Sequence, residues 1–222
     1  MRTRSFIIAY ALVLAILLFA DRRPGLTSHD RYSHVADLTD GTTNPTPHAA
    51  ATRSKTRIIA PAALIPGTWT AGQIPPERLV APLVILDLKA TVPGHLEISL
   101  DDIAAWESSH GMIPPGAVVA VRRARPASAS TSDTADTSFP IARDAVEFLM
   151  DARSTIGFAV ETQVNLALDR KLAQQIALHG SYVLEGTSPL ASLPATGSLV
   201  IVAPAKDMSP GETQVRILAM IH

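Results

Sequence analysis

A strongly apolar run, LVAPLVILDL, occupies Leu79–Leu88 and contains one proline, Pro82. A run of this length that is rich in Val, Leu and Ile predicts a buried β-strand. A shorter run, GAVVAV at Gly116–Val121, predicts a second buried strand further along the chain. The fold is therefore expected to be built around strands that are buried in its core.

Helical segments separate the expected strands. Ser99 is the expected N-cap of one helix, with Asp102 three residues later as in a capping box. The amphipathic segment Ala142–Ala152 predicts a second helix. Other expected strands are Ser33–Leu38, Thr155–Val160, Ser181–Leu184, Ser198–Val202 and Gln214–Ile221, and other expected helical segments are Leu166–Leu178 and Pro189–Leu193. Strands and helices mixed in this order predict one α/β domain.

The N-terminus has the pattern of a targeting segment. Arg2 and Arg4 precede an unbroken apolar stretch, Phe6–Ala20. A basic start with a short apolar core is typical of a secretory signal, and the stretch is somewhat short of the roughly 20 residues of a membrane span. Leu18 is bulky for a cleavage site. Residues 1–20 are therefore expected to be a signal peptide or an uncleaved membrane anchor, so the protein is expected to be exported, periplasmic or extracellular, or anchored by residues 6–20.

Composition separates the remaining chain into a polar tether and a folded domain. Residues 21–55 are rich in Pro, Thr and Ser and predict a tether with irregular structure, followed by an α/β domain at 56–222. Ala127–Ser138 is polar and of low complexity, which favours a loop. A net charge of -1 without a long basic run argues against nucleic-acid binding, and the absence of cysteine excludes disulfides and thiolate chemistry.

Six stretches, in order and at suitable spacing, resemble the cyclase family, whose best-known members are the bacterial kynurenine formamidases. They are Val35–Thr39 (VADLT), Ile74–Asp87 (IPPERLVAPLVILD), Trp106–Arg122 (WESSHGMIPPGAVVAVR), Phe139–Ala145 with Ala152–Thr162, Tyr182–Leu193 (YVLEGTSPLASL) and Gln214–Ala219 (QVRILA). The resemblance runs from about His34 to the C-terminus. It implies a swivelling β/β/α fold, assembly into dimers or tetramers, and hydrolysis of an amide or related bond by zinc or manganese.

The family's metal motif, HxGTHxDxPxH, is degenerate in this chain. In the family it supplies two His and one Asp to the metal and a last His for acid–base chemistry, and a later His and a Glu twelve residues after it complete the site. Aligned on Thr56 and Pro61, the positions of the two His, the Asp, the acid–base His and the later His hold Arg53, Arg57, Ile59, Ala63 and Ala173. Only Glu185 matches. A catalytic zinc needs about three protein ligands, so no bound metal or other cofactor is expected.

Basic residues stand at several of the altered positions. Lys55 replaces the motif glycine, and Arg123 and Arg125 stand at a family TGW triplet. With Arg53 and Arg57 they suggest a pocket for a small anion, because guanidinium groups pair with carboxylates and phosphates. Solvated charges or local ion pairs are the alternative.

Glu185 and two histidines have alternative interpretations. Glu185 could be a remnant ligand, or a strand-end carboxylate paired with an arginine such as Arg57. His179, six residues before it, could join it in a relocated metal site. His110 more simply ends a helix ahead of Gly111.

Three functions follow from these expectations. The first is an exported binding or structural pseudoenzyme that forms a homo-oligomer, binds a small anion, and meets a membrane only through its N-terminal segment. The second is an active hydrolase of amide, formamide or lactone bonds with an unorthodox or partner-completed site. The third is a subunit that regulates an active paralogue. No residue is expected with confidence to be catalytic, and the sequence contains neither G-x-S-x-G nor a Gly-rich phosphate loop.

Overall fold

The computed structural model describes residues 32–40, 55–88, 97–123 and 137–222. The expectations for residues 1–20, for most of the tether, for Arg53, for Arg125 and for most of the 127–138 loop lie outside these residues. The compact unit runs from His34 to His222, so it includes the first expected strand as well as the segment after residue 55. In the described part of the chain, no helix has the length and apolarity needed to cross a membrane.

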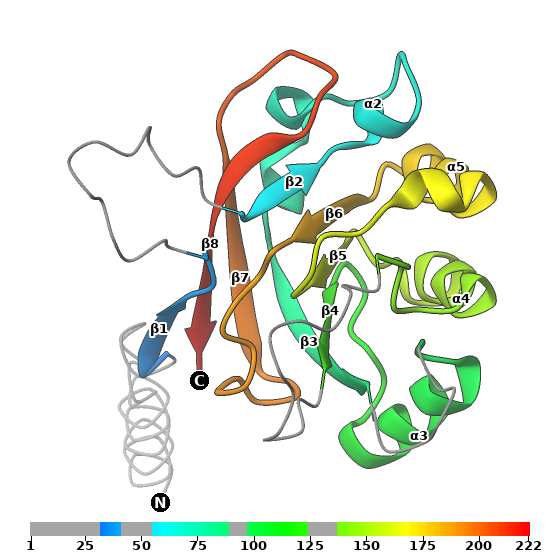
Figure 1. Cartoon of the computed structure of the whole chain (residues 1–222). Coiled ribbons are helices and arrows are strands. Elements are labelled where there is room, and N and C mark those ends of the chain that lie inside the picture. The colour runs from blue at the N-terminus through cyan, green and yellow to red at the C-terminus, as the bar shows by residue number, and fades with distance from the viewer. Residues whose placement is uncertain (1–31, 41–54, 89–96, 124–136) are drawn as a thin grey trace, which may run out of the picture. The chain divides into compact units, whose positions relative to one another are not determined.

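Seven strands form a sheet that closes on itself, and an eighth extends it (Figure 1). Around the closed part the order is β8-β2-β6-β5-β4-β3-β7, and β7 pairs again with β8, while β1 lies outside on β8. Neighbours among β3, β4, β5 and β6 are parallel, and all other pairs are antiparallel. The strands are β1 (His34–Asp37), β2 (Arg57–Ile59), β3 (Val80–Leu88), β4 (Val118–Arg123), β5 (Gly157–Val160), β6 (Tyr182–Glu185), β7 (Ser198–Pro204) and β8 (Thr213–Ile221).

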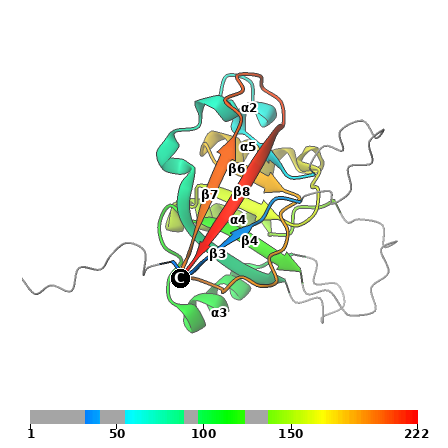
Figure 2. The same cartoon turned by 90° about the vertical axis from the view of Figure 1, so that its left-hand side faces the viewer.

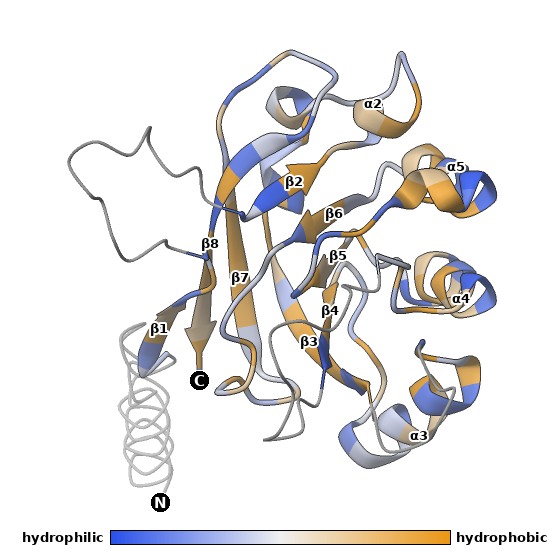
Figure 3. Ribbon diagram, viewed as in Figure 1, coloured by the Kyte–Doolittle hydropathy of each residue, from blue (hydrophilic) through white to orange (hydrophobic). Residues whose placement is uncertain are grey.

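Helices connect the parallel strands and cover one side of them. In Figure 1 they lie on the side away from β1, β7 and β8, and in Figure 3 hydrophilic residues mark the outer sides of α4 and α5. The helices are α2 (Pro61–Leu64), α3 (Leu100–His110), α4 (Arg143–Arg153) and α5 (Arg170–Leu178), with short 3₁₀ turns η2 (Ala71–Gln73), η3 (Pro76–Arg78) and η4 (Leu166–Leu168). A crossover helix between parallel neighbours is what this strand order requires.

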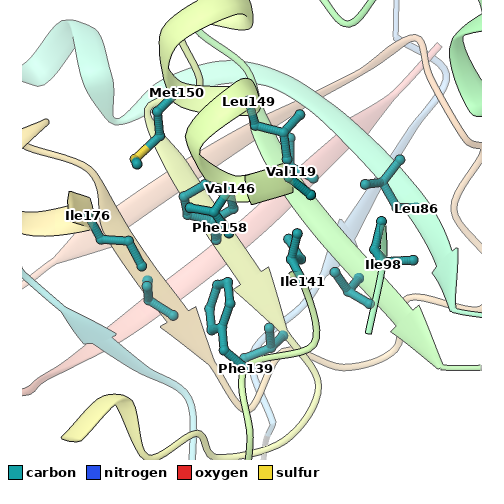
Figure 4. Packing of buried hydrophobic residues seen from close by; sticks show 14 of the residues in the cluster. Leu86, Ile98, Val119, Phe139, Ile141, Val146, Leu149, Met150, Phe158 and Ile176 are labelled. Atoms are coloured by element: carbon teal, nitrogen blue, oxygen red, sulfur yellow. The ribbon is translucent and has the colours of Figure 1, made fainter. Parts of the chain in front are cut away.

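The closed sheet has an apolar cluster on each of its two faces. Along β3, Leu83 and Ile85 point into the closed sheet, and Val84 and Leu86 point toward the helices. The cluster between strands and helices also contains Leu149 of α4 (Figure 4). Burial on both faces explains why this strand is a nearly continuous apolar run.

The structure confirms the expected strands and two of the four expected helical segments, α3 and α4. Ser99 and Asp102 form the expected capping box at the start of α3: the Ser99 amide donates to the Asp102 carboxylate at 2.9 Å, and the Asp102 amide donates back to the Ser99 hydroxyl. Two expected helical segments differ from the structure. Leu166–Leu178 is interrupted at Asp169, because this carboxylate accepts from the backbone N–H groups of Lys171 and Leu172 and so starts a new helix there.

Pro189–Leu193 forms a turn and not a helix. One backbone bond, from the Leu193 amide to the Leu190 carbonyl, closes the turn. The carbonyls of Leu190 and Leu193 accept from the guanidinium of Arg122, which also pairs with Asp87. Arg122 of β4 therefore occupies backbone carbonyls of this turn that would accept helical hydrogen bonds if the segment continued as a helix.

Candidate functional site

Strand β2 lies between β6 and β8 and carries Arg57 and Ile59, which stand where the resemblance implies metal ligands. Arg57 is the register partner of Glu185 on one side and of Gln214 on the other. Ile58 points into the closed sheet and Ile59 toward the helices. Because side chains alternate along a strand and paired residues share a face, Arg57 and Glu185 also point to the helix side.

The structure brings together the positions where the resemblance implies metal-binding and acid–base residues. Ile59 is buried in the helix-side cluster, and Ala63 of α2 and Ala173 of α5 pack against that cluster. Glu185 ends β6 on the same face of the sheet. The place expected for a metal therefore has an aliphatic wall, with a guanidinium and one carboxylate at its edge.

A hollow of about 680 Å³ opens beside two of these positions, those of Arg57 and Ala63. Arg57 and Ala63 form one side of it, and the connection between β7 and β8 supplies the other side with Pro210, Gly211, Glu212 and Gln214. Its lining thus contains the residues at two altered motif positions, those of the second metal His and of the acid–base His. The hollow is open to solvent at the Arg57 side chain, which is 37% exposed.

Arg57 pairs with Glu212 and not with Glu185. Its Nη1 lies 2.8 Å from the Glu212 Oε2, and both side chains are more than one-third exposed. The alternative that an arginine pairs with Glu185 is therefore wrong for Arg57. The β7–β8 connection places a second acid at the hollow's open side, where Arg57 reaches it without being buried.

Glu185 is almost fully buried, with 3% of its surface exposed. Its Oε2 accepts a hydrogen bond from the Val164 amide at 3.2 Å. Burial raises the pKa of the Glu185 carboxyl, and the charge of Glu212 raises it further, while the Val164 amide and the charge of Arg57 lower it. A neutral carboxylic acid is consequently favoured here more than in water.

Thr56, which matches the family motif, joins three chain segments. It is fully buried, its hydroxyl donates to the Gly186 carbonyl at 2.7 Å, and the same oxygen accepts from the Asp40 amide at 2.7 Å. Gly186 has a φ of 66°, and a Cβ there would lie 2.6 Å from the Lys55 carbonyl oxygen. The contact between β2 and the end of β6 therefore depends on Thr56 and Gly186.

The described basic residues do not meet in one pocket. Lys55 is exposed beside β2, and Arg123 ends β4, where its amide donates to Glu161. Strands β6 and β5 lie between β2 and β4, so Arg57 and Arg123 start about 14 Å apart at ~4.8 Å per strand. With Arg53 and Arg125 outside the described residues, only Arg57 is placed at the hollow.

Neither histidine considered above joins Glu185. His179 follows α5 and pairs with Asp151 at 3.0 Å, near the start of β6, whereas Glu185 ends that strand. The relocated metal site is therefore wrong for this pair. His110 ends α3 ahead of Gly111, as expected, and stacks on Trp106.

The described residues do not fit a zinc or manganese ion. Within ranges 32–40, 55–88, 97–123 and 137–222, no group of three His, Asp or Glu side chains could hold a metal. Arg57 adds a positive charge where a cation would sit, and burial opposes the ionised form of Glu185 that a metal requires. The site offers instead one guanidinium beside an aliphatic wall.

Sequence reasoning did not identify Glu212, Gln214 or Gly186 as parts of the site. Glu212 and Gln214 come to Arg57 through the pairing of β2 with β8, which joins segments 155 or more residues apart. No local pattern reveals that register. The position of Gly186 could have been noticed in the sequence, because a glycine directly after a strand often has a positive φ.

Comparisons with known proteins support this description of the fold. The sequence profile of the family described as Putative cyclase matches residues 27–165. Isatin hydrolase A from Labrenzia aggregata, bound to benzyl benzoate, is 23% identical with a TM-score of 0.64, and the match covers 85% of this chain and 93% of that one. Isatin hydrolase A from Ralstonia solanacearum is 24% identical with a TM-score of 0.65, covering 85% and 92%.

A third solved structure, a potential metal-dependent hydrolase with cyclase activity, is 22% identical with a TM-score of 0.60, and the match covers 85% of this chain and 98% of that one. No curated protein sequence matches this chain significantly. At these identities the solved structures establish the swivelling β/β/α fold alone. The profile match spans more than half of the sequence, and the chain therefore belongs to the putative cyclase family.

Proposed function

We propose that this chain is a binding member of its family that does not hydrolyse a substrate at a metal, and that the hollow beside Arg57 takes a small carboxylate or phosphate. One observation carries the proposal: the described positions where the resemblance implies metal-binding and acid–base residues hold Arg57, Ile59, Ala63 and Ala173, and Arg57 and Ala63 line the hollow. In the hollow the Arg57 guanidinium lies beside the small apolar side chains of Ala63 and Pro210, which suits an anion that has a small apolar body.

The ion pair of Arg57 with Glu212 allows such a ligand to compete. Both side chains are more than one-third exposed, and pairs of this kind contribute about 0–1 kcal/mol. A ligand with a millimolar dissociation constant binds with about 4 kcal/mol, so it can displace the Glu212 carboxylate. Arg57 would then offer two parallel N–H groups to the ligand's oxygens.

Calorimetric titration of the full chain with acetate, benzoate and inorganic phosphate tests this proposal. We expect heat at millimolar ligand for the native chain, loss of it in Arg57→Gln, and tighter binding in Glu212→Gln. Arg216→Gln is the matched control, because Arg216 is also an exposed arginine in an ion pair, with Asp37. The absence of heat with all three anions, or equal binding by Arg57→Gln, would contradict the proposal.

Glu185 favours a second candidate, a hydrolase that works without a metal. Glu185 is buried and the pKa of its carboxyl is raised, mainly by burial, so it holds a proton more tightly than an ordinary Glu, as a general acid does. Formyl-kynurenine, simple lactones and isatin are suitable substrates, the last because solved relatives are named isatin hydrolases. Hydrolysis by the native chain in the presence of a chelator, and its loss in Glu185→Gln, would establish this candidate in place of the first.

Export through residues 1–20 is part of the same proposal. The basic start and the apolar stretch at Phe6–Ala20 support it. Intact-mass measurement of the chain from the producing cell tests it: a start at or after residue 21 indicates a cleaved signal, and an intact N-terminus in the membrane fraction indicates an anchor. An intact chain in the cytosolic fraction would contradict both.

A further inference from the structure

Strands β6, β2 and β8 carry a row of three polar side chains. Arg57 of β2 is the register partner of Glu185 on β6 and of Gln214 on β8. Register partners on neighbouring strands share a face of the sheet and lie ~4.8 Å apart. Ile58 and Val215, the strand neighbours of Arg57 and Gln214, belong to the cluster inside the closed sheet. The row therefore places a carboxyl group, a guanidinium and a primary amide side by side on the outer face.

The hollow lies on the Gln214 side of Arg57. Gln214 lines it together with Arg57, whereas Glu185, which is 3% exposed, does not. In Figure 2 the connection between β7 and β8, drawn in orange to red, lies beside α2, and both segments contribute to the hollow's lining. At Gly211 of this connection, a Cβ would meet no atom within 4 Å. A ligand held by Arg57 therefore has room to extend over Gln214 and not toward Glu185.

The Gln214 side chain is exposed at the hollow and forms no hydrogen bond with any residue that the structure describes. By contrast, Gln73 accepts from the Thr70 amide and Gln175 donates to Glu147. A primary amide offers both N–H donors and a carbonyl acceptor, whereas a guanidinium offers donors only. Arg57 and Gln214 together therefore match a carboxylate that carries, one strand spacing away, a group that both donates and accepts.

The charge of Glu212 decides between a neutral and an acidic second group on the ligand. Glu212 lines the hollow and pairs with Arg57 at 2.8 Å. A ligand carboxylate that takes its place on Arg57 leaves the Glu212 carboxylate at the hollow, where it repels any further negative charge. A neutral amide avoids this repulsion and can still exchange two hydrogen bonds with the Gln214 amide. The site therefore favours an amide over a second carboxylate.

We propose that the hollow selects a carboxylate bearing a primary amide about one strand spacing away, with Arg57 holding the carboxylate and Gln214 holding the amide. This inference rests on the proposed function, because it requires an anion at Arg57. Succinamate has the required form, since its two methylene groups separate a carboxylate from a primary amide. Ala63 and Pro210 line the same hollow and offer apolar contacts to those methylene groups.

Calorimetric titration of the full chain with succinamate, levulinate and 4-methylpentanoate tests this selectivity. The three anions have the same skeleton, but levulinate lacks the amide N–H groups, and 4-methylpentanoate lacks the carbonyl as well. We expect the native chain to bind succinamate about tenfold more tightly than 4-methylpentanoate, because two hydrogen bonds to Gln214 are gained. In Gln214→Leu the preference should be lost, and in the matched control Gln174→Leu, at an exposed glutamine of α5, it should remain.

The outcomes separate this inference from the proposed function. Equal affinity of the native chain for the three anions, with binding lost in Arg57→Gln, would overturn the inference and leave the proposed function intact. An undiminished preference in Gln214→Leu would do the same, and Gln214→Met, which also removes the amide, replaces that variant if it does not fold. If none of the three anions binds, the inference is overturned, and acetate titrated in the same series shows whether the proposed function falls with it.

Discussion

Thr56 and Arg57 are adjacent on the chain, yet Thr56 is fully buried between chain segments and the Arg57 side chain is exposed at a hollow. Thr56 matches the motif of the resemblance and ties β2 to Gly186 through a buried hydrogen bond and to Asp40 through a partly buried one. Arg57 is one of the positions that differ from the motif of the resemblance, as are Ile59 and Ala63. The residue that holds the strands together thus matches the motif of the resemblance, and the exposed residue beside it stands where the resemblance implies a metal ligand.

Aliphatic side chains at these positions are consistent with stable packing of the cluster between the strands and the helices. Ile59 fills the helix-side cluster, and Ala63 and Ala173 pack against it as α2 meets α5. Polar metal ligands without a metal would be costly at these positions, because buried polar groups need partners. Thr56 and Gly186 should therefore be sensitive to substitution, whereas the exposed Arg57 should tolerate it.

Among the substitutions that test this comparison, Gly186→Ala should cause the largest loss of stability. Its positive φ and the 2.6 Å approach of a Cβ to the Lys55 carbonyl oxygen strain the contact between β2 and the end of β6. We expect the free energy of unfolding to fall by about 3 kcal/mol or more. Urea denaturation measures it, with Gly211→Ala as the control because a Cβ there meets no atom within 4 Å. Equal losses of stability for the two variants would contradict the claim that the contact between β2 and the end of β6 depends on Gly186.

Thr56→Val should have the next largest effect. The variant keeps the shape of the side chain but leaves the Asp40 amide and the Gly186 carbonyl without the Thr56 hydroxyl. We expect a loss of about 1–3 kcal/mol in the same measurement. Thr68→Val, which removes only a local bond to Ile65 at a less buried site, should lose less. If Thr68→Val lowers the free energy of unfolding more than Thr56→Val does, Thr56 does not join these chain segments as described.

Glu185→Gln should change how stability depends on pH. The folded-state pKa of Glu185 is raised, mainly by burial, so the folded chain holds this proton more tightly than the unfolded chain does. Its contribution is intact below the unfolded pKa, about 4.3, and is lost as pH rises through the raised folded pKa. Glu185→Gln should therefore gain stability relative to the native chain as pH increases from 4 to 8. The opposite slope in paired denaturation series would mean that Glu185 is held as an ion.

Arg57→Gln should have the smallest effect on stability. Its ion pair with Glu212 is exposed, so we expect a change within about 1 kcal/mol. Arg153→Gln provides a contrast, because the Arg153–Glu107 pair is less exposed and Glu107 also accepts from the Ile113 amide. If Arg57→Gln unfolds the chain more readily than Arg153→Gln does, Arg57 is a structural residue and not a binding residue.

The sequence allowed the fold to be predicted well, because the signals are local or extend along one strand. The apolar run at Leu79–Leu88 and the Ser99–Asp102 capping box both appear in the structure as expected. The site was less predictable, because its partners meet through tertiary pairing. Glu212 reaches Arg57 only through the β2–β8 register, which the chain pattern does not specify.

The metal content of the purified chain tests the central claim most directly. The chain is purified without chelators, incubated with zinc or manganese, dialysed and measured by elemental analysis. Restoring the motif with Arg53→His, Arg57→His and Ile59→Asp, together with Ala173→His, gives a positive control that should gain bound zinc. The account predicts far less than one zinc or manganese ion per native chain, and one tightly bound ion per native chain would contradict it.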